Sequence, residues 1–86
     1  MTNKTRLAIF PGTFDPITNG HLDIIRRGSN LFESLIVAVG DNPDKKSLFT
    51  QSQRIEMIRP ALAAMANVKV EAYAGLTIDL ARRLGI

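Results

Sequence analysis

Three short apolar runs, separated by longer segments of helical periodicity, constrain the fold of this chain more than any other feature. The runs cover residues 6–10, 34–40 and 68–73. Each is too short for a helix and the three lean toward β-branched residues, so each predicts a strand. The first is expected to be buried on both faces and to stop at Pro11-Gly12, because proline and glycine interrupt regular structure.

A first helix is predicted between the first two strands, over roughly residues 19–32, with Thr18 as its N-cap. The apolar residues of this segment recur at helical intervals and form one broad face, which is expected to pack on the sheet. They are Leu22, Ile24, Ile25, Leu31 and Phe32.

A second helix is predicted between the second and third strands. Thr50 and Gln53 have the spacing of a capping box at its start. The apolar residues that follow at helical intervals are Ile55, Ile58, Leu62 and Met65. A proline inside a helix costs about 3 kcal/mol, so Pro60 predicts a kink or a break near Arg59. A third helix is predicted over roughly residues 76–84.

The resulting order, β-α-β-α-β-α, predicts an α/β fold with a Rossmann-like parallel sheet and helices on both faces, as a portion of a doubly wound domain. With 86 residues, the chain has room for a single domain, which spans residues 1–86. Doubly wound folds bind ligands at the carboxyl ends of their strands, beside strand one. The loop after Phe10 is therefore expected to hold the site.

Composition excludes several classes of site. The chain has no cysteine and one histidine, so disulfides, Cys-type zinc sites and multi-histidine metal centres are excluded, and no protein metal site is expected. Its net charge of +3 comes from scattered residues, which favours small anions over nucleic acid as partners. The apolar run before Pro11-Gly12 is only four residues long, so neither a membrane segment nor a secretory segment is predicted and a cytoplasmic location is expected.

The loop from Pro11 to His21 has the ingredients of a phosphate site. Gly12 allows close approach of the backbone, Thr13 brings a hydroxyl and an amide, and the helix that follows begins with N–H groups that attract anions. His21 is expected in the first helical turn. The loop matches neither the GxGxxG fingerprint nor the P-loop pattern.

Residues 12–21, Gly-Thr-Phe-Asp-Pro-Ile-Thr-Asn-Gly-His, resemble the T/HxGH nucleotidyltransferase superfamily, with Thr18-Asn19-Gly20-His21 as its signature. Together with residues 44–50, they are similar to the bacterial phosphopantetheine adenylyltransferases. The resemblance implies adenylyl transfer from ATP to 4′-phosphopantetheine, giving dephospho-coenzyme A and pyrophosphate in coenzyme A biosynthesis. It also implies Mg²⁺ bound through the ATP phosphates, coenzyme A or dephospho-coenzyme A as ligands, and a homo-oligomer, usually a hexamer.

The resemblance also implies roles for five residues. Thr13 contacts the acceptor phosphate and, with Phe14, the nucleotide. His21 stabilises the transition state at the ATP phosphates, and Lys45 orients the acceptor phosphate. Thr77 matches a position that lines the pantetheine arm.

Several alternatives remain open at this point. A related nucleotidyltransferase, such as nicotinate mononucleotide adenylyltransferase or a cytidylyltransferase, shares the first block of residues. Members of the resembled family are longer, so the chain is expected to be their N-terminal half, inactive alone, or a catalytically incomplete nucleotide-binding fragment. Phe14 packs under the loop in the plainest interpretation, and Asp15 before Pro16 is expected to shape a turn rather than to bind a metal.

Overall fold

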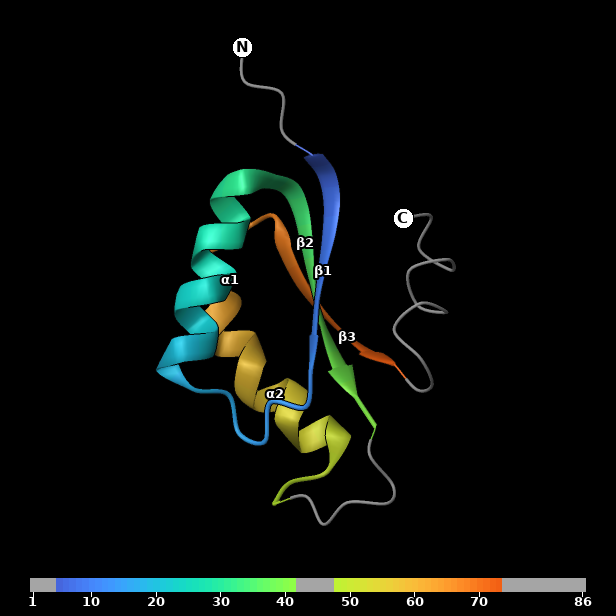
Figure 1. The fold of residues 1–86 in the computed structure, drawn as a ribbon. Coiled ribbons are helices and arrows are strands. Elements are labelled where there is room, and N and C mark those ends of the chain that lie inside the picture. Colours follow the sequence, from blue (N-terminus) through green and yellow to red (C-terminus); the bar gives the residue numbers. More distant parts are fainter. Residues whose placement is uncertain (1–4, 42–47, 74–86) are drawn as a thin grey trace.

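A three-stranded parallel sheet with two crossover helices makes up the part of the chain that the computed structural model describes, residues 5–41 and 48–73 (Figure 1). The strands lie in the order β1-β2-β3, and both pairings are parallel. The Rossmann-like α/β prediction is therefore confirmed. The elements are β1 (Thr5–Gly12), α1 (Asn19–Leu31), β2 (Phe32–Gly40), α2 (Gln51–Leu62) and β3 (Val68–Tyr73).

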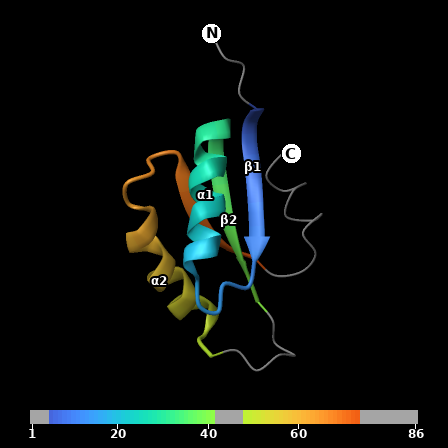
Figure 2. The same ribbon diagram turned by 60° about the vertical axis from the view of Figure 1, so that its left-hand side comes forward.

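Both helices cover the same face of the sheet, as the two views in Figures 1 and 2 agree. This follows from the strand order, because two right-handed crossovers that step in the same direction place their helices on the same side. Helices were predicted on both faces, and within the described residues they cover one; the helix predicted over residues 76–84 lies outside those residues.

The core lies between this face and the helices. Val37 and Val39 are fully buried on β2, and they pack with Ile25 of α1 and Ile58 of α2, which are also fully buried. Alternate residues of a strand point to opposite faces, so Val37 and Val39 share the helix-covered face. The central strand thus anchors both helices.

The first strand differs from its prediction. It runs through Pro11 to Gly12 instead of stopping before them, and its apolar residues from Leu7 to Phe10 are half-buried rather than buried on both faces. Within the described residues β1 is an edge strand, paired only with β2. An edge strand tolerates proline because the missing N–H is not needed by a second neighbour.

The helix boundaries also refine the predictions. Thr18 caps α1 as predicted, but the helix ends at Leu31, and Phe32 takes an extended conformation and begins β2. The apolar face is narrower than expected, since Ile24 and Leu31 are 53% and 64% exposed. Neither described helix is long and apolar enough to cross a membrane.

The second helix begins with the predicted capping box, in which the Thr50 and Gln53 side chains each accept a hydrogen bond from the other residue's backbone. It does not break near Arg59 but continues through Pro60 and ends at Leu62. Pro60 has no N–H to donate to the carbonyl four residues earlier, and the helix ends soon after it, at Leu62.

Candidate functional site

The loop from β1 to α1 makes a tight turn at the carboxyl end of β1. Phe14 has a φ of 51°, which is unusual for a residue with a side chain, and the residue is only 3% exposed. A Cβ on Gly12 would lie 2.8 Å from the Phe14 ring. The turn therefore requires glycine at position 12, and the aromatic ring lies folded back beneath it.

The Phe14 ring supports the histidine that the sequence singles out. The ring centroids of Phe14 and His21 are 4.9 Å apart with an interplanar angle of 74°, and Phe10 contacts Phe14 edge-on at 5.3 Å. Such edge-to-face contacts are favourable for aromatic rings. Phe14 is buried as a whole residue, and the packing interpretation of its ring agrees with the structure.

His21 belongs to the cap of α1. Its Nδ1 accepts a hydrogen bond from the Thr18 backbone N–H over 3.0 Å, and its own backbone N–H donates to Thr18 Oγ1 over 3.2 Å. Since Nδ1 acts as the acceptor, the proton of the neutral imidazole resides on Nε2. The cap thus sets both the orientation and the tautomer of the ring.

The first turn of α1 also supplies backbone donors. Within residues 5–41 and 48–73, the N–H groups of Asn19 and Gly20 have no protein acceptor, as expected for the first residues of a helix. A Cβ on Gly20 would approach nothing closer than Thr18 Oγ1, at 3.6 Å. This open helix start, beside the Gly12 turn, suits an anionic group.

Asp15 joins the loop to the segment that leads into α2. Its carboxylate accepts hydrogen bonds from the backbone N–H groups of Leu48, over 2.6 Å, and Phe49, over 2.9 Å. These contacts agree with the expected structural role, because both carboxylate oxygens are engaged by the backbone. The Asp15-Pro16 peptide bond is cis.

Sequence analysis missed Arg54, which lies on α2 and is 2% exposed. Its guanidinium donates to the carbonyl oxygens of Thr13 (2.7 Å), Gly40 (2.9 Å) and Phe49 (3.2 Å). A signal was present, since Arg54 stands four residues before the buried Ile58 and so falls on the inward face of the helix.

Gln51 fastens the start of α2 to the sheet. Its Nε2 donates to the carbonyl oxygens of Val39 (2.8 Å) and Tyr73 (3.0 Å), which are near the carboxyl ends of β2 and β3. Gln51 thus joins the start of α2 to the carboxyl edge of the sheet, where the candidate loop also lies.

Three of the five predicted site residues meet at this edge: Thr13, Phe14 and His21. Lys45 and Thr77 lie outside the described residues. Within the described ranges no group of three histidine, aspartate or glutamate side chains is placed to hold a metal ion.

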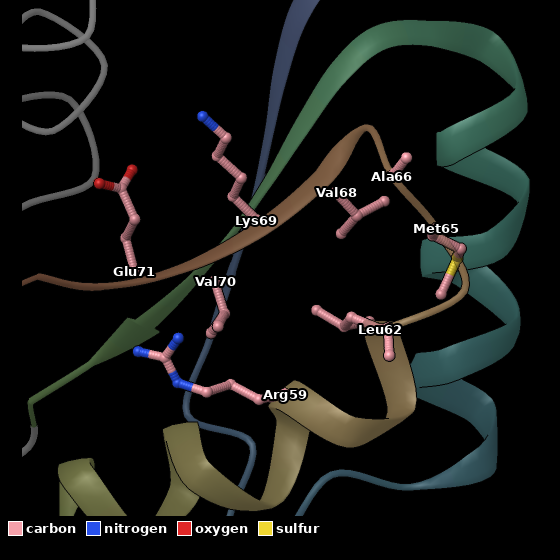
Figure 3. A pocket seen from close by; sticks show the side chains of 9 residues that line it. Arg59, Leu62, Met65, Ala66, Val68, Lys69, Val70 and Glu71 are labelled. Atoms are coloured by element: carbon pink, nitrogen blue, oxygen red, sulfur yellow. The ribbon is translucent and has the colours of Figure 1, made fainter.

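A separate groove runs between α2 and β3, away from the loop (Figure 3). Arg59 and Leu62 line it from the helix, and Val70 lines it from the strand. Lys69 and Glu71 extend from β3 on the side away from α2 (Figure 3). Of the predicted site residues that the structure describes, Thr13, Phe14 and His21, none lines this groove.

Comparisons with known proteins point to one family. The sequence matches the cytidylyltransferase-like family over residues 9–86. It is 57% identical over 76 residues to the phosphopantetheine adenylyltransferase of Clostridium kluyveri, covering 88% of this chain and 46% of that protein. The phosphopantetheine adenylyltransferase of Finegoldia magna is 52% identical over 83 residues, which are 96% of this chain and 51% of that protein.

A third phosphopantetheine adenylyltransferase, from Heliobacterium modesticaldum, is 51% identical over 79 residues, which are 92% of this chain and 47% of that protein. The chain therefore spans about half the length of the curated relatives it matches. The similarity includes nearly all of the described residues.

Proposed function

Because the chain belongs to the cytidylyltransferase-like family, we propose that it contributes to adenylyl transfer from ATP to 4′-phosphopantetheine, with dephospho-coenzyme A and pyrophosphate as products. The choice of acceptor rests on the relatives, which carry the name phosphopantetheine adenylyltransferase at 51% to 57% identity. The proposal concerns the reaction of a protein about twice as long as this chain.

One structural observation carries the proposal. The capping box between Thr18 and His21 holds the imidazole at the start of α1, directly over the buried Phe14 ring. A helix start favours phosphate through its N–H groups and its dipole. His21 thereby combines a neutral N–H donor with a site that attracts a polyphosphate.

The chemistry needs positioning and charge stabilisation rather than a covalent intermediate. A phosphate oxygen of the acceptor attacks the α-phosphorus of ATP in line, the new P–O bond forms, and the bond to the β-phosphate oxygen breaks to release pyrophosphate. The acceptor is already an anion, so no general base is required. His21 donates its Nε2–H to the phosphate oxygens as charge shifts toward the leaving group.

The remaining site residues have assisting roles in this proposal. Thr13 contacts the acceptor phosphate and, with Phe14, the nucleotide. Lys45 orients the acceptor phosphate as a cation, which offsets the repulsion between two polyanionic substrates. Thr77 lines the pantetheine arm. The roles of Lys45 and Thr77 stand on the resemblance alone.

Magnesium enters this proposal with the nucleotide. The Asp15 carboxylate is engaged by two backbone N–H groups, and the donor set of the described site is one of N–H groups and a hydroxyl, which suits phosphate oxygens rather than a cation. Phosphate oxygens of ATP are therefore the ligands that fit. The ion supplies charge neutralisation of the polyphosphate.

The proposed enzyme is cytoplasmic and binds coenzyme A or its dephospho form. It is a homo-oligomer, which the resemblance implies is a hexamer. Size measurement of the longer protein by light scattering tests the oligomer.

Pyrophosphate release tests the function. The chain is measured alone and as a chimera in which the second half of the Finegoldia magna relative follows it, with 4′-phosphopantetheine or nicotinate mononucleotide as acceptor and ATP or CTP as donor. We expect turnover by the chimera with ATP and 4′-phosphopantetheine only. Turnover with another pair would assign a sister reaction, and nucleotide binding without turnover of any pair would support a binding module.

A further inference from the structure

Among the described residues, the buried guanidinium of Arg54 binds main-chain oxygens alone, which is unusual for an arginine. The three carbonyls come from three separate segments: Thr13 in the loop after β1, Gly40 at the end of β2, and Phe49 just before α2. Arginine is almost never fully buried unless it is paired. Here a single side chain joins three of the segments at this edge of the sheet.

The charge of Arg54 has no acidic partner in the described part of the chain. The ion pairs among residues 5–41 and 48–73 are Arg27 with Asp23 and Arg59 with Glu56, both between exposed side chains. Carbonyl oxygens accept hydrogen bonds from Nε and Nη1 of Arg54, and no carboxylate among the described residues pairs with its positive charge. A fixed positive charge at a partly desolvated position acts strongly on a nearby anion.

We propose that Arg54 is a positioning residue of the phosphate site. By drawing the Thr13 carbonyl inward, it holds the Gly12–Phe14 turn in the conformation that faces the ligand, and its charge favours a polyphosphate over a monophosphate there. This inference rests on the proposed function, since ATP is the anion concerned.

Geometry explains why the residue is arginine. The planar guanidinium offers donors in a rigid fork that reaches three carbonyls in different directions, whereas lysine has a compact ammonium on a flexible stem. Lysine at position 54 keeps the charge but is expected to hold fewer of the three segments.

The test uses the 86-residue chain and three variants, Arg54→Gln, Arg54→Lys and Arg59→Gln. Arg59 is the matched control because it lies on the same helix but is exposed and pairs with Glu56. Dissociation constants for ATP and for AMP are measured by NMR titration. Hydrogen exchange of the Phe14 amide, relative to the buried core amide of Val37, reports the order of the turn without ligand.

We expect Arg54→Gln to weaken ATP binding by about tenfold, the equivalent of one charge-assisted hydrogen bond, and AMP binding by less. The preference for ATP over AMP then shrinks, the Phe14 amide exchanges faster, and Val37 is unchanged. Arg54→Lys recovers part of the ATP affinity, and Arg59→Gln behaves as the unmodified chain.

Equal losses for ATP and AMP, or unchanged binding and exchange in a folded Arg54→Gln, would overturn the proposal. If Arg54→Gln does not fold, Arg54→Lys tests the proposal instead. We then expect weaker ATP binding and faster exchange of the Phe14 amide, and wild-type values of both would overturn the proposal. If the unmodified chain binds no nucleotide, the function of this half-site fails, and the exchange data alone then support or overturn the positioning role.

Discussion

The backbone N–H of Thr18 donates to Nδ1 of His21, while the backbone N–H of His21 donates to Oγ1 of Thr18. Histidine here takes the place that glutamate or glutamine usually holds in a capping box. One side chain therefore completes the helix cap and leaves Nε2 as its only other hydrogen-bonding atom. The same contact serves the stability of α1 and the chemistry proposed for the site.

The tautomer of His21 is directly measurable. We expect a long-range ¹H–¹⁵N spectrum at mildly alkaline pH to show the proton on Nε2, because Nδ1 is the acceptor for Thr18. Thr18→Ala removes the Oγ1 acceptor and is expected to cost about 1 kcal/mol of stability, whereas Thr18→Ser retains it. A proton on Nδ1 in the neutral ring would contradict the described cap.

His21→Gln separates the two functions of this residue. Glutamine can accept the Thr18 N–H as a capping-box residue, so the unfolding free energy is expected to stay within about 0.5 kcal/mol of the original. Losing the imidazole is expected to lower the transfer rate of the chimera by about 10²–10³-fold. Urea unfolding and pyrophosphate release measure the two effects, with His21→Ala as the control that loses both.

Gly20→Ala is expected to raise the unfolding free energy and to lower the affinity for ATP. A Cβ meets only Thr18 Oγ1, at an ordinary contact distance of 3.6 Å, and alanine favours a helix by about 1 kcal/mol over glycine. The same methyl group crowds the helix start, so ATP affinity is expected to fall. Asn30→Ala, at an exposed position of the same helix away from its start, is the control and is expected to leave ATP affinity unchanged.

Gly12→Ala tests the turn. The new Cβ would overlap the Phe14 ring, so a loss of about 1–3 kcal/mol is expected in thermal or urea unfolding. Phe14→Leu replaces that ring with a smaller side chain, so Gly12→Ala is expected to cost less unfolding free energy in the Phe14→Leu background. A double-mutant cycle detects this difference as coupling. Additive effects would mean that the two residues do not meet.

Gln51→Glu tests the tie between α2 and the sheet. A carboxylate would face the Val39 and Tyr73 carbonyl oxygens in place of the amide donor, so a loss of about 1–3 kcal/mol is expected. Gln53→Glu is the control, because glutamate is a normal capping-box residue at that position and its charge suits a helix start. Equal unfolding free energies of the two variants would refute the tie.

Local patterns were sufficient to predict most of the fold. The apolar run at residues 68–73 matched β3 to the residue, and the caps at Thr18 and Thr50 were confirmed, because each depends on neighbours within a few positions. The errors arose where the place of an element in the tertiary structure decides its burial. The half-burial of β1 follows from its place at the edge of the described sheet, which no local pattern contains.

The site was predicted in part for the same reason. The motif located the loop and His21, but the roles of Arg54 and Asp15 depend on partners distant in sequence, Thr13 for the first and Leu48 for the second. An arginine on a helix normally indicates a solvent-exposed position. The one sign that Arg54 is buried was its spacing from Ile58, which places both on the inward face of α2. The left-handed φ of Phe14 had no signal in the local sequence.

The hydrogen bonds that the Asp15 carboxylate accepts from Leu48 and Phe49 have a consequence for the order of events in folding. They join residues 33 and 34 positions apart, across a helix and a strand, so they form only after β2 has paired and the start of α2 has arrived. Loop closure of this kind comes late relative to local helix formation. The ability to bind a phosphate is therefore expected to mature last, after the secondary structure that surrounds it.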